Sequence, residues 1–172
     1  MQLVEAKRWW SLGLALLLAL ALAQRSDVRL ELKAFRVLVV EEQGRRVERL
    51  EAALEAKPGE LLEYQLSALN TSNSPLRQVA LVIPIPPGTA YQQGSAQPLR
   101  LGQALVAPEF SFDGGRTYGQ PPLKRKVRVV EGGKEVEKEV EVKPEEYTHV
   151  RWILPQMEAK QTVLLRLRVV VR

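Results

Sequence analysis

The sequence predicts an all-β protein, an antiparallel β-sandwich preceded by the helix of an N-terminal signal peptide. Three observations lead to this prediction. From residue 28 onward the dominant hydrophobic period is two, as in half-buried strands. Turn signals separate roughly eight to ten such stretches, which is typical of a sandwich. The predicted strands are preceded by an uninterrupted apolar stretch at 12–22, which lacks their alternation.

The first residues have the order of a secretory signal peptide. Lys7 and Arg8 form a short positive region, an uninterrupted apolar stretch follows at 12–22, and small residues stand at positions 21 and 23. A signal peptidase recognises this order of charge, apolar core and Ala-x-Ala. We therefore predict a signal peptide over residues 1–23.

Cleavage there makes Gln24 the first residue of the mature chain and leaves a single domain over 24–172. The alternative is an uncleaved anchor, but the apolar stretch is shorter than the ~20 residues of a spanning helix, so we expect no stable transmembrane span after cleavage. The chain has no cysteine, which excludes a lipoprotein anchor, disulfides and thiolate metal sites. We predict export to the periplasm or cell surface of a bacterium.

The first two predicted strands lie on either side of a turn at 41–45. Val28, Leu30 and Leu32 alternate with charged residues, and the phase then slips near Ala34, which predicts a β-bulge. The stretch 49–60 is ambiguous, because its Leu, Ala and Glu favour a helix by propensity. Its alternation and the Pro-Gly that ends it favour a strand, which is our prediction.

The later elements follow the same alternation. The polar loop 70–75 separates two strands, and Glu131-Gly132-Gly133-Lys134 predicts the turn of a hairpin. In the last strand the apolar residues share one face, while Arg166 and Arg168 lie on the other. The further predicted strands cover residues 62–68, 79–83, 127–130, 136–142, 147–154 and 163–171.

Residues 58–95 contain a longer pattern. Its parts are a Pro-Gly before an acidic residue, an aromatic strand ending in Asn, a polar loop, and a Pro-x-Gly turn followed by an aromatic residue and Gly-Ser. The positions are Pro58, Gly59, Glu60, Tyr64, Asn70, Val79, Pro86, Gly88, Tyr91, Gly94 and Ser95. Together with the closing tryptophan strand, this pattern resembles the conserved repeat domain of bacterial cell-envelope proteins, domain of unknown function eleven.

The resemblance implies an immunoglobulin-like β-sandwich outside the cytoplasm that acts as a structural or spacer module. It implies no catalytic residues. The sequence departs from the family pattern at Ile85, where many members place Thr next to an Asp. It also carries additional residues before the tryptophan strand, so we expect a hairpin insertion around 108–146.

Residues 111–118 read SFDGGRTY, the order of the Asp-box of sialidase-like propellers. In that motif the aspartate carboxylate accepts hydrogen bonds from its own turn and glycine supplies a positive φ. A propeller needs several four-stranded blades, for which this chain is too short. We interpret Asp113 as the centre of a turn and not as part of a glycosidase.

Other chemistry-bearing residues are sparse. The chain has one histidine, His149, and two widely separated aspartates, so we predict no metal, cofactor or catalytic residue. The glutamates of 135–141 alternate along one strand, which indicates a solvated charged face that discourages aggregation.

One compact basic cluster stands out: Lys124, Arg125, Lys126 and Arg128. It is either a solvated strand end or a contact for an anionic wall polymer or lipid head group. The basic excess elsewhere is too dispersed to predict nucleic-acid binding.

We therefore expect an exported, non-enzymatic cell-envelope β-sandwich with a structural or protein-interaction role. Its partner would be an envelope protein or an anionic wall polymer, and it could assemble into a larger envelope structure. The alternative is a carbohydrate-binding module that stacks sugars on Tyr91, Tyr118 and Trp152, which requires exposed rings. Abundant Leu, Glu and Arg without cysteine suggest a thermophile.

Overall fold

The computed structural model describes residues 27–172, so the predicted signal peptide lies outside the described residues. Within this range the chain is all-β, with one 3-10 turn at Pro144–Glu146 and no α-helix. The strands are β1 (Val28–Glu42), β2 (Arg45–Ala52), β3 (Leu61–Asn70), β4 (Leu76–Pro84), β5 (Thr89–Tyr91), β6 (Leu99–Leu101), β7 (Ala104–Val106), β8 (Glu109–Ser111), β9 (Lys124–Glu131), β10 (Lys134–Glu141), β11 (His149–Met157) and β12 (Thr162–Val171).

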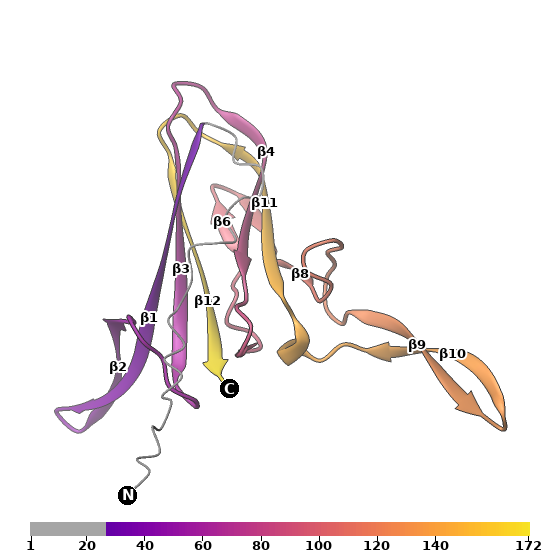
Figure 1. Ribbon diagram of the computed structural model, residues 1–172. Helices are drawn as coiled ribbons and strands as arrows, with labels where there is room; N and C mark the ends of the chain where they lie inside the picture. The colour runs from indigo at the N-terminus through magenta and orange to yellow at the C-terminus, as the bar shows by residue number, and fades with distance from the viewer. Residues whose placement is uncertain (1–26) are drawn as a thin grey trace, which may run out of the picture.

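Two antiparallel sheets form the body of the protein (Figure 1). One has the order β2-β1-β3-β12-β5, and the other has the order β4-β11-β8. Two further hairpins, β6–β7 and β9–β10, form sheets of their own. The prediction of an all-β antiparallel fold is confirmed.

The core lies between the two sheets because every second residue of the central strands is apolar. On β3 these residues include Leu62, Tyr64 and Leu66, and on β11 they include Trp152, all at most 1% exposed. Burial of one such side chain contributes about 1.5 to 3 kcal/mol. Trp152 Nε1 donates to the Gln97 carbonyl at 3.1 Å, which confirms Trp152 as the core aromatic residue.

Asn70 fastens the end of β3 to the segments that lie beside it at the same end of the sandwich. Its side chain is fully buried, and the two hydrogens of its Nδ2 are shared among the carbonyls of Ser74, Met157 and Glu158 at 2.9, 3.2 and 2.9 Å. Its Oδ1 accepts from the Ser72 N–H at 2.9 Å and the Ser72 hydroxyl at 2.8 Å. The asparagine that ends the aromatic strand is therefore a structural clamp between two loops.

The predicted β-bulge near Ala34 is wrong. The register of β1 with β3 runs without interruption from Val28 opposite Asn70 to Arg36 opposite Leu62. The apolar phase changes because β1 continues beyond the sandwich core and pairs there with β2 on its other side. A change of environment, and not an extra residue, causes the slip.

The predicted strand over 49–60 is correct only in its first part. β2 ends at Ala52, and the following residues form a loop in which Leu54 is 86% exposed. The N–H of Ala53 still donates to the Ala34 carbonyl at 3.0 Å, but the ladder then ends. The alternation of apolar residues continues in the sequence after Ala53, where the chain no longer pairs with β1.

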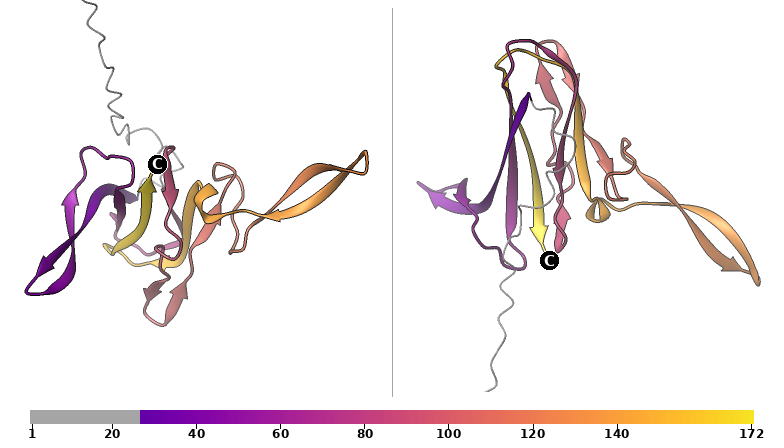
Figure 2. Two further views of the ribbon diagram at one scale, coloured as in Figure 1. Left: turned by 90° about the horizontal axis from the view of Figure 1, so that it is seen from below. Right: turned by 45° about the horizontal axis from the view of Figure 1, so that its top comes forward.

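Two hairpins project from the body on opposite sides (Figure 2). We call residues 38–52 the β1–β2 arm and residues 124–141 the β9–β10 arm. Both predicted turns are present, at Gln43-Gly44 and at Gly132-Gly133, with all four φ values positive between 51° and 77°. Positive φ at both central residues matches the twist of a two-residue hairpin turn. No residue of β2, β9 or β10 is buried.

Candidate functional site

The basic cluster predicted as a partner-binding site lies on the β9–β10 arm. Lys124, Lys126 and Arg128 share one face of β9, because side chains alternate along a strand, whereas Arg125 lies on the other face. The arm thus brings three of the four residues together on one face and separates the fourth.

The glutamates of β10 lie directly beside this cluster. Lys124 Nζ is 3.7 Å from a Glu139 carboxylate oxygen, and Lys126 Nζ is 3.6 Å from one of Glu137. All four side chains are more than half exposed, so these pairs contribute little to stability. This face therefore carries charges of both signs. The pairing was not predicted from the sequence because the lysines and the glutamates are more than ten residues apart.

Arg125 points instead to the base of the arm. Its Nη1 donates to Glu146 Oε2 at 2.6 Å, and this hydrogen bond lowers the pKa of Glu146. The N–H of Val142 donates to the Leu123 carbonyl at 2.8 Å. Leu123 and Val142 are both buried in the core, so the arm starts from a fixed point.

The Asp-box residues form a turn, as predicted. The Asp113 carboxylate accepts hydrogen bonds from the Thr117 hydroxyl at 2.6 Å and the Thr117 N–H at 3.0 Å. It also accepts from the Ser111 hydroxyl at 2.8 Å and the Arg116 N–H at 3.1 Å. These donors, the Thr117 hydroxyl first, hold the pKa of Asp113 well below its usual range.

The same turn requires glycine at position 115. Its φ is +83°, and a Cβ there would lie 3.0 Å from the Tyr118 hydroxyl oxygen. The turn therefore packs tightly against Tyr118, and a side chain at position 115 would strain both the backbone and this contact.

His149 lies on the outer face of β11, beside this turn. Its Nδ1 is 3.1 Å from the Thr148 hydroxyl oxygen, and burial lowers its pKa. On the same face Arg151 donates to Glu109 Oε2 through Nε at 3.0 Å and Nη2 at 2.6 Å, and its guanidinium covers the Tyr118 ring at 3.9 Å. Tyr118 is half-buried beneath that cation and is not free to stack on a sugar face.

The other two rings of the carbohydrate-binding hypothesis are buried. Tyr91 is 4% exposed and Trp152 is 0% exposed. Tyr91 stacks on Tyr147, with ring centroids 5.9 Å apart, and contacts Phe110 at 5.3 Å. These aromatic residues form a core cluster, as a scaffold requires and a glycan-stacking platform does not.

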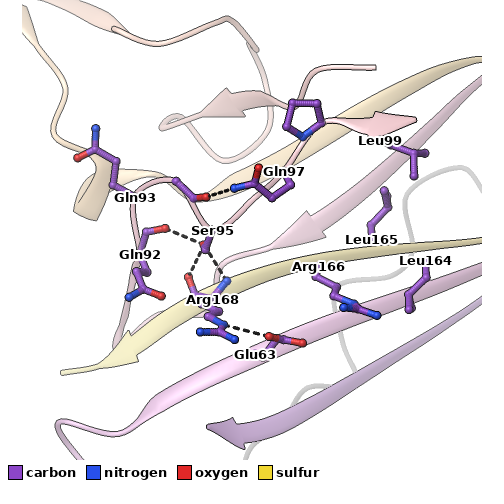
Figure 3. Close-up of a pocket in the computed structure, with 12 residues that line it drawn as sticks. Glu63, Gln92, Gln93, Ser95, Gln97, Leu99, Leu164, Leu165, Arg166 and Arg168 are labelled. Carbon is purple, nitrogen blue, oxygen red and sulfur yellow. Dashed lines mark hydrogen bonds and ion pairs between the residues drawn. The ribbon is translucent and has the colours of Figure 1, made fainter. Parts of the chain in front are cut away.

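A groove that the sequence did not indicate runs along β12 (Figure 3). It has a volume of about 530 Å³ and lies between β12 and the segment that leaves β5. Its lining residues are Glu63, Gln92, Gln93, Gly94, Ser95, Gln97, Pro98, Leu99, Leu164, Leu165, Arg166 and Arg168.

An ion-pair network forms one wall of this groove. Arg168 donates from Nε to Glu63 Oε2 at 3.0 Å, and from Nη1 and Nη2 to the two oxygens of Glu48 at 3.0 and 2.6 Å. The bidentate pair with Glu48, followed by the bond to Glu63, raises the pKa of Arg168. Glu48, whose pKa falls through the same bond, ties β2 to the central strands. Arg168 is therefore fully engaged.

Arg166, two residues away, is different. It is exposed and makes no ion pair with any residue in 27–172. The two outward arginines were visible in the sequence, but only the structure distinguishes the engaged Arg168 from the unengaged Arg166.

A scan against protein-family models found no match, and neither the curated proteins nor the solved structures gave a significant similarity. Within residues 27–172 no cluster of His, Cys, Asp and Glu could hold a metal ion. No helix in that range has the length and apolar character needed to cross a membrane.

Proposed function

We propose that this chain is an exported, non-enzymatic β-sandwich of the bacterial cell envelope, immunoglobulin-like in architecture, with a structural or protein-interaction role. The order of residues 7–23 supports export, and the pattern of 58–95 with the closing tryptophan strand supports the envelope assignment. Its partner is an envelope protein or an anionic wall polymer.

The observation that carries the interaction role is the pair of arms. A two-stranded hairpin by itself is marginal in water, because it can bury little apolar area. Nevertheless both arms extend from the body without a covering layer from residues 27–172, and they expose Val39 at 64% and Val130 at 72%. Exposed strand edges and exposed apolar side chains of this kind are typical of surfaces that bind another molecule, and binding would stabilise the arms.

Export is tested by N-terminal sequencing of the native protein. We expect the mature chain to begin at Gln24, in an envelope or extracellular fraction. Recovery of a chain that begins at Met1 from the cytosol would contradict the export assignment.

The role of the β9–β10 arm is tested by replacing residues 124–141 with an Asn-Gly turn. The anchors Leu123 and Val142 remain, joined by their hydrogen bond, so the sandwich should keep its unfolding midpoint. We expect the shortened protein to be lost from washed envelopes, whereas the parent protein is retained. A shortened protein that folds and is retained equally would refute a binding role for this arm.

A further inference from the structure

We propose that the open edge of β12 binds an extended, acidic segment of another protein, which adds a strand to the five-stranded sheet. Among residues 27–172, the edge is open along the N-terminal part of β12. β5 pairs only with Val169–Val171 at the C-terminal end of β12. The chain then turns away after Gln92, whose N–H donates to the Arg168 carbonyl at 2.8 Å. Within residues 27–172, the rest of β12 pairs with β3 alone.

Every second residue of β12 points its backbone N–H and C=O groups towards this edge. In an antiparallel ladder a residue points both its N–H and its C=O to the same side, and the side alternates along the strand. Arg168 points both groups away from β3, because its N–H donates to the Ser95 hydroxyl at 2.9 Å and its carbonyl accepts from Gln92. Leu164 and Arg166 therefore point theirs to the same open side, where no residue in 27–172 meets them.

The groove along β12 lies at this edge. Arg166 and Leu164 line it from the outer face of β12, and Leu165 lines it from the inner face. A cavity bordered by both faces of a strand opens onto its edge. The opposite wall carries the amide side chains of Gln92 and Gln93, which can donate to and accept from a peptide backbone, whereas Gln97 Nε2 already donates to the Gly94 carbonyl.

The charges of the groove select the partner. Its charged lining residues are Glu63, Arg166 and Arg168. Glu63 and Arg168 pair with each other at 3.0 Å, so the charge left without a partner among residues 27–172 is the positive charge of Arg166. A carboxylate on the incoming strand would pair with Arg166 in a partly desolvated setting.

The other exposed edges are less suitable. Gln78 on β4 has a φ of +51°, which breaks the regular extended edge of that strand. The edge strand β2 carries charged side chains at most positions, a common way of discouraging strand addition. The edge of β12 is regular, recessed and bordered by one unpaired charge.

The geometry also sets the spacing in the ligand. Leu164, which is 42% exposed, and Arg166 lie on one face of β12, two residues apart. Residues opposite them on an added strand are also two apart, so we expect an apolar residue at one position and a carboxylate two positions away. This is the recognition mode in which backbone bonds give affinity and alternate side chains give specificity.

The test is fluorescence polarisation with a labelled octapeptide, Ser-Val-Ser-Glu-Ser-Val-Ser-Glu, titrated with the chain that begins at Gln24. We expect saturable binding. The same peptide N-methylated at its valines and glutamates keeps the side chains but lacks the strand donors, and it should not bind. A peptide with lysine in place of glutamate should not bind either.

Three variants test the protein side, one of them as a control. Arg166→Glu should weaken binding roughly tenfold, the effect of losing a charge-assisted hydrogen bond. Arg29→Glu makes the same change of net charge on the exposed face of β1 and should leave binding unchanged. Leu164→Pro removes an edge-facing N–H that takes no part in the ladder with β3, which is where a strand tolerates proline, and it should abolish binding. If Leu164→Pro unfolds, the N-methylated peptide tests the same hydrogen bonds.

Equal binding of the parent and N-methylated peptides would overturn the proposal, and so would equal loss in Arg166→Glu and Arg29→Glu. No saturable binding would overturn it too. If the parent is a dimer in gel filtration and Leu164→Pro is a folded monomer, the edge takes a second copy, and the proposal is again wrong. The inference rests on the proposed interaction role, but peptide binding and envelope retention are measured separately, so the failure of one is distinguishable from the failure of the other.

Discussion

Replacement of the buried clamp residue Asn70, the last residue of β3, by alanine should strongly destabilise the protein. The change removes an amide that donates to three carbonyls, those of Ser74, Met157 and Glu158, and accepts from Ser72. The Met157 carbonyl lies in the buried end of the sandwich, where an unsatisfied acceptor costs free energy that exposed groups recover from water.

The magnitude follows from counting the bonds that water cannot replace. Each net hydrogen bond contributes about 0.5 to 1.5 kcal/mol, and the Ser72 donors become hydrated after the change. The two or three hydrogen bonds to the carbonyls are lost without replacement by water, which lowers the free energy of unfolding by about 2 to 4 kcal/mol. In urea this corresponds to a decrease of roughly 1 to 2 M in the midpoint.

The assay is urea unfolding followed by tryptophan fluorescence. Trp152 is the only tryptophan after residue 24 and is fully buried, so its emission reports the core. The matched control is Asn73→Ala, an exposed asparagine in the loop that follows β3, which should change stability by no more than about 0.5 kcal/mol. Equal midpoints for Asn70→Ala and Asn73→Ala would refute the clamp.

Three other changes are expected to have measurable effects. The pKa of Asp113 is lowered in the folded state, so its carboxylate stabilises the protein above the unfolded pKa of about 4, and this stability is lost as the pH falls through the folded pKa. Asp113→Ala should therefore destabilise the protein at neutral pH and flatten the acid side of its stability profile in unfolding at several pH values; an unchanged profile would contradict the turn network. Arg168→Met removes the cation beside the buried carboxylate of Glu63, which keeps its hydrogen bond from Gln65, and should cost about 1 to 3 kcal/mol in urea unfolding. Arg166→Met should be nearly neutral, and equal effects of the two changes would rule out the network as a stabilising element. Reversal of the three basic charges at 124–126 should weaken envelope association and flatten its salt dependence, and unaltered retention in washed envelopes would eliminate that face as the contact.

The strand pattern was predictable because it depends on local alternation. A strand covered on one face must place apolar residues at every second position, and β3, β4, β11 and β12 all do so within single stretches of sequence. The same holds for the two hairpin turns, where Gly44, Gly132 and Gly133 adopt a positive φ that glycine accepts without strain.

The prediction failed where alternation continued without a partner strand or changed phase for a non-local reason. Residues 54–58 continue the alternation in sequence, but they pair with no strand of residues 27–172. The hydrogen bonds to β1 end at Ala53, and those to β12 begin at Gly59. At Ala34 the phase changes because β1 leaves the core, which depends on the length of β3 and the position of β2.

The candidate sites divide in the same way. The sequence by itself determined which side chains exist: four basic residues in a row with one gap, one Asp-box, and two outward arginines on the last strand. Only the tertiary structure decided their partners. It placed the glutamates of β10 beside the lysines of β9, engaged Arg168 with Glu48 and Glu63, and left Arg166 on the strand edge where β5 turns away. The physical reason is that alternation along a strand fixes which face a side chain occupies, whereas the order of strands in a sheet, and therefore every edge and every cross-strand pair, is set by packing between segments far apart in the chain.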